Sequence, residues 1–390
     1  MHAQTIVLRF LDQHVLMHAA RRRLLAAAVS VVMGGHWIGV SHLGRGLAGT
    51  KRVKSAIKRV ERLIGNSHRI HDEAQQVGAA LMAQICRMTS TVVIAVDWSA
   101  ASPGGAFVEL RAGATWPGAG RTLPIYQRVY PVSHLGNPAI ERELLKTLSA
   151  WVPAGIRVVV LTDAGFRRRW FAQVRRRHWF FVGRVRRGMG LSLGRRWWPA
   201  QDWFARATRY AQRFTDCRLS KNRPLVCDAV LYRRPPRHRR PHAHPHRYAP
   251  TSHEARARTR AHEPWLLVHS PELTEHFRPD EIVALYARRM QIEETFRDSK
   301  SPAFGLGFSI GRSRTAARLH ALLLIATLAA FLLWHIGQLA EAEGLHRRFR
   351  QTTRVGREIS IITLALLLCR STDPPLPPHA ILALQIRLAI

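Results

Sequence analysis

The chain has 390 residues, of which 47% are hydrophobic, so it is long and apolar enough to bury a large core and to form two or three domains. This composition excludes a disordered or fibrous protein. Its 60 Lys and Arg residues against 25 Asp and Glu residues give a formal net charge of +35, which indicates a polyanionic partner, with nucleic acid first and an anionic membrane surface second.

The cysteine pattern and the N-terminal sequence indicate the cellular compartment in which the chain acts. The four cysteines have no CxxC pair and no regular spacing, so they indicate neither a zinc site nor a disulfide framework. This is typical of a reducing cytoplasm, where we expect the chain to act. The N-terminus lacks a charged start followed by an apolar run, and no signal peptide is therefore expected.

Residues 1–88 are expected to form a small helical domain, because they show no clear strand pattern. We expect this domain to bind DNA, because one of its predicted helices has a cationic face. Within residues 50–64, apolar side chains recur at helical spacing and cations fall on the opposite side. The apolar face consists of Val53, Ile57, Val60 and Ile64, and the cationic face of Lys51, Lys54, Lys58 and Arg62. A cationic face is often only solvated, but four cations without an acid favour contact with DNA phosphates.

The segment after residue 88 is expected to build a mixed α/β sheet. Residues 91–97 are a short β-branched run that ends in Asp97, as a buried central strand would. Residues 157–163 repeat this pattern and end in Asp163, before an Arg-rich helical stretch. Between these two runs we expect strands at 106–111 and 122–132 and a helix at 138–151.

Residues 178–278 indicate an inserted β-rich module, because short strand candidates alternate there with polar loops. The candidates are residues 179–185, 225–232 and 265–269. Inside this module, residues 233–260 are rich in Arg, His and Pro. Irregular spacing and interleaved prolines favour a mobile basic loop over a metal site, and we assign this tract no ligand role.

The last part of the chain is expected to be helical. Pro279 begins a long helix that runs to about residue 298, and largely buried helices are predicted at 315–342 and 359–369. The uncharged apolar stretch at 321–334 has 14 residues, whereas a membrane span needs about 20. We therefore expect a buried helix and no membrane segment.

Two carboxylates stand where the two buried strand candidates end. If the strands are neighbours, Asp97 and Asp163 lie at one edge of the sheet. Phosphodiester cleavage commonly uses two Mg²⁺ ions, and Mg²⁺ prefers carboxylate oxygens, so such a pair suits a metal site. Either aspartate alone is weak evidence, because an Asp at a strand end is more often a turn or helix cap.

A third carboxylate belongs to a polar set in the predicted long helix. Tyr286, Arg289, Glu293 and Lys300 lie at offsets of 0, 3, 7 and 14 residues, which places all four on one helical face. A solvated polar stripe is the ordinary interpretation of such a face. An acid flanked by a phenol and two cations also suits a phosphate chain that passes a metal site.

These four residues match the spacing Y-x2-R-x3-E-x6-K without a gap. The pattern resembles the YREK signature of the DDE transposases of insertion-sequence family four. Other blocks also resemble that family, and the resemblance covers most of the chain. These blocks are residues 56–66, 96–98, 162–166, 301–307 and 312–315.

The resemblance implies an RNase H-like catalytic core, interrupted by a β-strand insertion domain, with Asp97, Asp163 and Glu293 as the metal ligands. The ion would be Mg²⁺ in a two-ion site, with Mn²⁺ as a substitute. Tyr286, Arg289 and Lys300 would hold phosphates near the transposon end. Trp265 matches an insertion-domain tryptophan on which relatives stack a flipped base; a tryptophan in the core of a strand is the alternative.

The resemblance further implies cut-and-paste transposition of double-stranded DNA by a homodimer that pairs two terminal inverted repeats. The expected domains are residues 1–88, 89–177, 178–278, 279–345 and 346–390, the last being C-terminal helices. Two alternatives stay open: an RNase H-like endonuclease that cleaves without joining, and a non-catalytic DNA-binding repressor.

Overall fold

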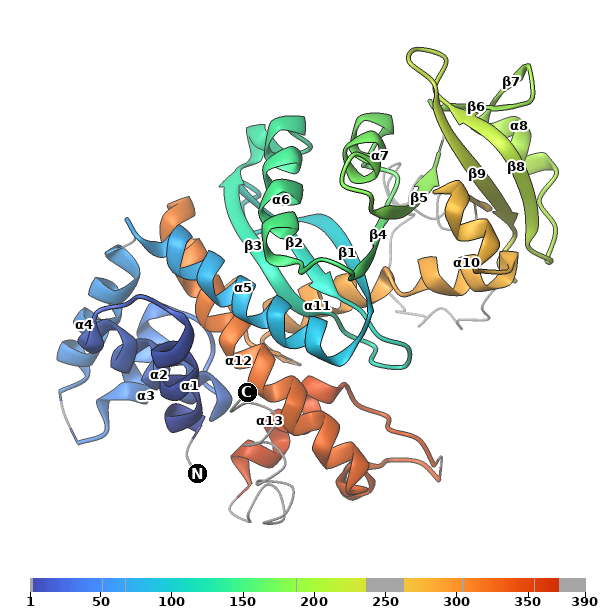
Figure 1. The fold of residues 1–390 in the computed structure, drawn as a ribbon. Helices are drawn as coiled ribbons and strands as arrows, with labels where there is room; N and C mark the ends of the chain where they lie inside the picture. Colours follow the sequence, from blue (N-terminus) through green and yellow to red (C-terminus); the bar gives the residue numbers. More distant parts are fainter. Residues whose placement is uncertain are drawn as a thin grey trace, which may run out of the picture. The chain divides into compact units, whose positions relative to one another are not determined.

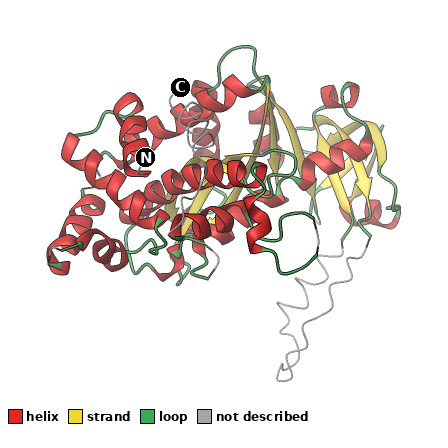
Figure 2. Ribbon diagram, turned by 90° about the horizontal axis from the view of Figure 1, so that it is seen from below, coloured by secondary structure: helices red, strands yellow, loops and turns green. Residues whose placement is uncertain are grey.

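The computed structural model describes residues 3–50, 52–66, 68–186, 188–235, 263–303, 305–353 and 355–371 (Figure 1). The chain divides into two compact units, which are described separately. The first unit comprises residues 1–158 and 288–390, and the second comprises residues 159–287. Both combine helices with strands, so the chain is a mixed α/β protein (Figure 2).

Helices alone build the described part of residues 3–88, as the sequence predicted. The five helices are α1 (Ala3–His14), α2 (Ala19–Met33), α3 (Val40–Ala48), α4 (Val53–Gly65) and α5 (Ile70–Met88). Asp72 and Glu73 lie in the first turn of α5, where carboxylates interact favourably with the helix dipole. Glu73 is also buried, and both its oxygens accept hydrogen bonds from Arg21 of α2 at 2.7 and 2.8 Å.

Helix α4 has the predicted apolar and cationic faces, but its apolar face begins later than expected. Val60 and Ile64 are fully buried, whereas Val53 is 44% exposed, so the buried face begins at Ala56. Gly44 of α3 explains how closely these helices approach, because an added Cβ there would lie 2.7 Å from the Ile57 Cα atom.

Three antiparallel strands follow in the first unit, and these are β1 (Thr91–Ala100), β2 (Phe107–Ala114) and β3 (Leu123–Pro131). The prediction that the first strand ends at Asp97 was wrong. Pairing with β2 continues past Asp97, which lies opposite Arg111, through Ser99 opposite Glu109. Asp97 is thus held inside the strand, where its backbone is fixed by the ladder.

Helices cover this meander within the first unit. Helix α6 (Pro138–Trp151) has the predicted bounds, because Pro138 suits the first helical turn and the Asn137 side chain accepts a hydrogen bond from the Ala139 amide at 2.9 Å. Helices α5 and α12 (Ala316–Ala342) pack against β3, α11 (Met290–Lys300) packs against β1, and α13 (Ile361–Arg370) packs on α12. Short 3₁₀ turns occur in this unit at Val132–His134, Phe308–Ile310 and Leu345–Phe349.

Helix α12 is the apolar centre of the first unit. Within the described residues it is the one helix long and apolar enough to cross a membrane, and its apolar window is entirely buried inside the structure. It packs against β3, α2 and α13. Burial by protein on all sides is typical of a core helix, which agrees with the sequence prediction.

Strand β4 (Arg157–Thr162) begins in the first unit, where the Arg157 amide donates to the Ser90 carbonyl at 2.9 Å, and ends in the second. Within the first unit the strand order is β3-β2-β1, and within the second unit β4 pairs in parallel with β5 (Phe180–Val185). An antiparallel meander followed by parallel strands is consistent with an RNase H-like core.

The second unit continues from β5 in the order β10-β9-β8-β6-β7, paired antiparallel. These strands are β6 (Gly190–Leu193), β7 (Arg196–Pro199), β8 (Gln212–Leu219), β9 (Leu225–Tyr232) and β10 (Trp265–His269). Its helices are α7 (Arg168–Arg175), α8 (Ala200–Ala205) and α10 (Pro279–Ala287), with a 3₁₀ turn at Pro271–Glu275. The β-rich character of residues 178–278 is therefore present, although the sequence did not indicate β6, β7, β8 or α8.

The predicted long helix from Pro279 to about residue 298 is wrong. It is divided into α10 and α11 by a turn at Arg288 and Arg289, where the Gln291 and Ile292 amides bond three residues back at 2.9 and 3.1 Å. Such tight bonds end the α-helical pattern. Tyr286 consequently lies in α10 of the second unit and Lys300 in α11 of the first, so the single shared helical face does not exist.

Candidate active site

Asp97 is held in the middle of a paired strand and is only partly accessible. Its Oδ1 atom accepts a hydrogen bond from the Trp98 amide at 2.8 Å, and its side chain is 15% exposed. The carboxylate is therefore fixed in position but not sealed from solvent. A fixed but accessible carboxylate can bind a metal ion that also contacts a second molecule.

Arg289 joins Asp97 to Glu293. Its Nη1 donates to Asp97 Oδ2 at 3.3 Å, and its Nη2 donates to Glu293 Oε1 at 2.5 Å. The guanidinium side chain is 10% exposed, whereas that of Glu293 is 43% exposed. The first unit thus brings together three of the predicted site residues, with one cation shared by two carboxylates.

Lys300 lies on the same side of α11 as Glu293, because seven residues are close to two helical turns. Its Nζ atom donates to Ser99 Oγ at 2.6 Å and lies 4.0 Å from Glu109 Oε1. Burial lowers the pKa of Lys300, nearby Glu109 raises it, and Arg111 lowers it further. The ammonium is anchored on β1, two residues beyond Asp97.

Glu109 and Arg111 were missed in the sequence analysis. They form an ion pair of 2.9 Å, with side chains 0% and 1% exposed. The signal that would have indicated them is an acid and a base two residues apart in a predicted strand, which places both on one face.

Trp98 connects the Asp97 strand to a second buried carboxyl group. Its indole Nε1 donates to Glu141 Oε1 at 3.3 Å. Burial raises the pKa of Glu141 to about 7, and the hydrogen bond from Trp98 opposes that rise. Glu141 therefore titrates near neutral pH, one side chain removed from Asp97.

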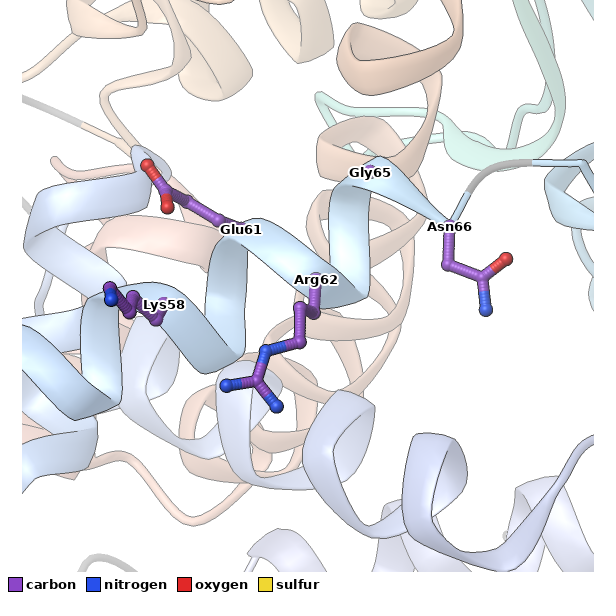
Figure 3. A pocket seen from close by; sticks show the side chains of 5 residues that line it. All are labelled: Lys58, Glu61, Arg62, Gly65 and Asn66. Carbon is purple, nitrogen blue, oxygen red and sulfur yellow. The ribbon is translucent and has the colours of Figure 1, made fainter.

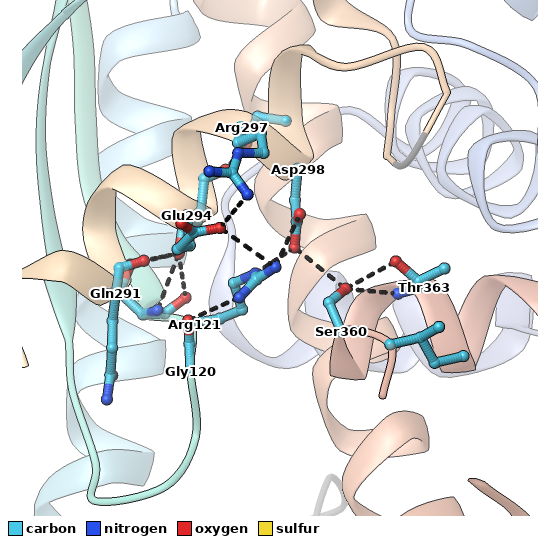
Figure 4. A network of polar contacts seen from close by, with 12 residues as sticks. Gly120, Arg121, Gln291, Glu294, Arg297, Asp298, Ser360 and Thr363 are labelled. Atoms are coloured by element: carbon cyan, nitrogen blue, oxygen red, sulfur yellow. Dashed lines mark hydrogen bonds and ion pairs between the residues drawn. The ribbon is translucent and has the colours of Figure 1, made fainter. Parts of the chain in front are cut away.

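Helix α11 is fixed from its other side by a polar network (Figure 4). Arg121 Nε donates to Asp298 Oδ2 at 2.6 Å, and Ser360, the N-cap of α13, donates to the same oxygen at 3.4 Å. Arg121 also lies 3.6 Å from Glu294. These contacts hold the helix that carries Glu293 and Lys300.

The donor set fits a divalent cation of the Mg²⁺ type. Asp97 and Glu293 supply hard carboxylate oxygens, and both already contact the same guanidinium, so one cation can reach them together. Within the described ranges, no three His, Cys, Asp or Glu side chains gather at one point. Within the first unit, the structure thus brings two carboxylates onto one guanidinium.

Asp163 belongs to the second unit, directly after β4. Its Oδ1 atom accepts a hydrogen bond from the Gly165 amide at 2.7 Å. This contact forms a turn, which is the ordinary role of an Asp at the end of a strand and the alternative to metal binding. The side chain is half-buried, and Phe166 beside it is 2% exposed and packs on Trp170.

Trp265 and Tyr286 lie together in the second unit. Their rings meet edge to face with centroids 5.0 Å apart, and the Arg234 guanidinium lies 5.6 Å from the Trp265 ring centroid. Trp265 is half-buried, whereas Tyr286 is only 3% exposed. The tryptophan thus has an accessible part backed by an aromatic partner.

The basic face of α4 is exposed, as predicted for Lys54, Lys58 and Arg62. Lys58 and Arg62 line an open hollow of about 620 Å³ near the C-terminal end of the helix together with Glu61, so this part of the face is not free of acids, contrary to the prediction (Figure 3). Lys51 lies outside the described residues, as do residues 236–260 of the Arg/His-rich tract and residues 372–390 at the C-terminus.

The chain matches a known protein family. The family described as "Transposase DDE domain" matches residues 136–332, which is just over half of the chain and includes Asp163 and Glu293. No curated protein matches the chain significantly.

Proposed function

The chain belongs to the DDE transposase family, and on that premise we propose that it is a cut-and-paste DNA transposase whose metal ligands are Asp97, Asp163 and Glu293. The observation that carries this proposal is the pair of carboxylates joined by Arg289 within the first unit. The uninterrupted YREK spacing supports membership of insertion-sequence family four and similarity to the transposase of the insertion sequence that flanks the bacterial tetracycline-resistance transposon.

The chain's own groups hold the DNA strand and the reacting phosphate. Arg289 and Lys300 supply charge to phosphates, Tyr286 supplies a hydroxyl, and Trp265 offers a stacking surface for an unpaired base. Residues 1–88 bind the terminal inverted repeat through the cations of α4. Two Mg²⁺ ions, when bound, activate the attacking oxygen and stabilise the leaving oxygen, and Mn²⁺ substitutes for them.

The reaction proceeds by displacements at phosphorus. Water attacks the phosphate at the transposon end, the P–O3′ bond breaks, and a 3′-OH is released. That hydroxyl attacks a phosphate of the opposite strand, which gives a hairpin and releases the flanking DNA with a 3′-OH. A second water breaks the P–O3′ bond of the hairpin and regenerates the 3′-OH. This hydroxyl then attacks a phosphate of the target DNA and displaces the 3′-oxygen of the target strand. Two copies of the chain pair the two ends, acting in the bacterial cytoplasm.

The proposal is tested with a labelled duplex that carries the terminal inverted repeat of the encoding element. Purified wild-type chain and Glu293→Ala are incubated with Mg²⁺, and the products are separated on a denaturing gel. Nicked and hairpin products from wild type alone support the proposal. Nicks without hairpins or joined products favour an endonuclease, and tight binding without cleavage in Mg²⁺ or Mn²⁺ favours a repressor.

A further inference from the structure

A buried charge pair lies beneath Lys300 on the sheet face that carries Asp97. Across the β1–β2 ladder, Arg111 is opposite Asp97 and Glu109 is opposite Ser99. Directly opposed and alternate residues share a face, so all four side chains belong to one face of the meander. Helix α11 packs on this face, since Arg111 Nη1 donates to Ser299 Oγ at 3.2 Å.

One oxygen of Glu109 is committed to Arg111 and the other faces Lys300. Glu109 Oε2 accepts from Arg111 Nη2 at 2.9 Å. Glu109 Oε1 is buried without a hydrogen-bond partner among the described residues, and it lies 4.0 Å from Lys300 Nζ. The fully buried carboxylate of Glu109 therefore faces the Lys300 ammonium, which also donates a hydrogen bond to Ser99 Oγ.

The aromatic ring of Phe296 in α11 lies close to both Arg111 and Lys300. Arg111 lies 4.5 Å and Lys300 5.0 Å from the centroid of its ring, so both cations contact one aromatic side chain. Burying a charged pair is costly, and apolar residues of similar volume usually stabilise a core as well or better. The contact of this pair with Lys300 therefore points to a role other than stability.

We propose that Glu109 is a positioning residue for Lys300, which it holds on the Asp97 side of the sheet for contact with a DNA phosphate. This inference rests on the proposed function, because it requires that Lys300 contacts DNA. Arg111 acts with it, since it keeps the Glu109 carboxylate in place and is itself held by Ser299.

The test is a double-mutant cycle on DNA cleavage with Glu109→Gln, Lys300→Ala and the double variant. Glutamine retains the volume and an oxygen for Arg111 but removes the anion that faces Lys300. Misplacing a reacting-site group by about 1 Å can cost about 100-fold, so Glu109→Gln is expected to slow cleavage by about 10- to 100-fold. In the Lys300→Ala background the same change should cost less than about twofold.

Measuring the affinity of each variant for the same duplex distinguishes a positioning role of Glu109 from a direct effect of its negative charge on DNA binding. Glu109→Gln makes the chain more positive, and charge alone predicts tighter DNA binding. The positioning role predicts instead slower cleavage without tighter binding, and a salt dependence of binding that is weakened by about one charge, as in Lys300→Ala.

Glu73→Gln is the matched control, because Glu73 is also a buried carboxylate, with its side chain 3% exposed, and pairs with an arginine, Arg21, at 2.7 Å, but it belongs to α5 and not to α11. Its effect on cleavage should add to that of Lys300→Ala. Urea unfolding of each variant confirms that a folded chain is measured.

The outcomes distinguish this inference from the proposed function. If wild type cleaves and Lys300→Ala is slow, but Glu109→Gln is equally harmful with and without Lys300, the positioning role is overturned and the transposase activity stands. If Lys300→Ala cleaves like wild type, both the DNA contact of Lys300 and the inference are overturned. If wild type does not cleave, the proposed function itself fails.

Discussion

Replacing Arg289 by Ala should strengthen binding of a divalent cation while it weakens DNA cleavage. The guanidinium occupies Asp97 Oδ2 and Glu293 Oε1, the oxygens that a metal ion would need. Charge-assisted hydrogen bonds contribute about 1.5–3 kcal/mol each, and the exposure of Glu293 reduces its share, so we take about 2 kcal/mol for the two contacts. A cation that no longer competes with them should bind roughly 30-fold more tightly.

The assay is calorimetric titration of Mg²⁺ into DNA-free Arg289→Ala and wild-type chain. Arg297→Ala is the matched control, because Arg297 lies on the same helix and pairs with Glu294 at 2.7 Å, with its side chain 63% exposed. It should leave Mg²⁺ affinity unchanged. Unchanged or weaker Mg²⁺ binding by Arg289→Ala would refute the reasoning that one cation replaces the other.

Three other predictions concern separate parts of the chain. Because burial raises the pKa of Glu141 from 4.5 to about 7, its stabilising contribution is complete below pH 4.5 and is lost as pH rises through 7. Glu141→Gln should therefore flatten the fall in unfolding free energy over that window, as measured by urea unfolding; an unchanged slope contradicts it. Gly337→Ala should lower the free energy of unfolding by about 1–3 kcal/mol, less the gain in helix propensity, because the added Cβ of α12 would overlap the Ile361 backbone oxygen of α13. An unchanged melting temperature would show that α12 and α13 separate easily. Lys58→Ala should reduce the salt dependence of binding to the terminal-repeat duplex by about one charge, which filter binding at several salt concentrations measures, and an unchanged slope removes Lys58 from the interface.

Strand β1, which carries Asp97, and strand β4, which Asp163 follows, were visible in the sequence because their β-branched runs are uniformly apolar, as buried strands are. Helix α6 was visible because Pro138 suits the first helical turn and Glu141 follows it within that turn. In these elements local preference and tertiary packing agree, so pattern alone was sufficient.

The break at Arg288 and Arg289 was not visible, because neither residue is a helix breaker. Helical periodicity therefore continued across a turn that the tertiary structure imposes. The same limit applies to β6 and β7, whose four residues each are too few to show a period.

The partners of Lys300 were hidden for a different reason. Glu109 and Ser99 become its neighbours only through the register of β1 against β2 and the packing of α11. Register depends on pairing between distant segments, which single-sequence periodicity does not encode.

The most direct test of the central claim replaces Asp163, the proposed ligand of the second unit, by Cys. A thiolate is a softer ligand than a carboxylate and binds Mg²⁺ poorly, whereas Mn²⁺ accepts it better. Cleavage of the terminal-repeat duplex by Asp163→Cys is compared in the two metals, with wild type alongside. The account predicts no cleavage in Mg²⁺ and partial recovery in Mn²⁺; cleavage at the wild-type rate in Mg²⁺ would show that Asp163 is not a metal ligand.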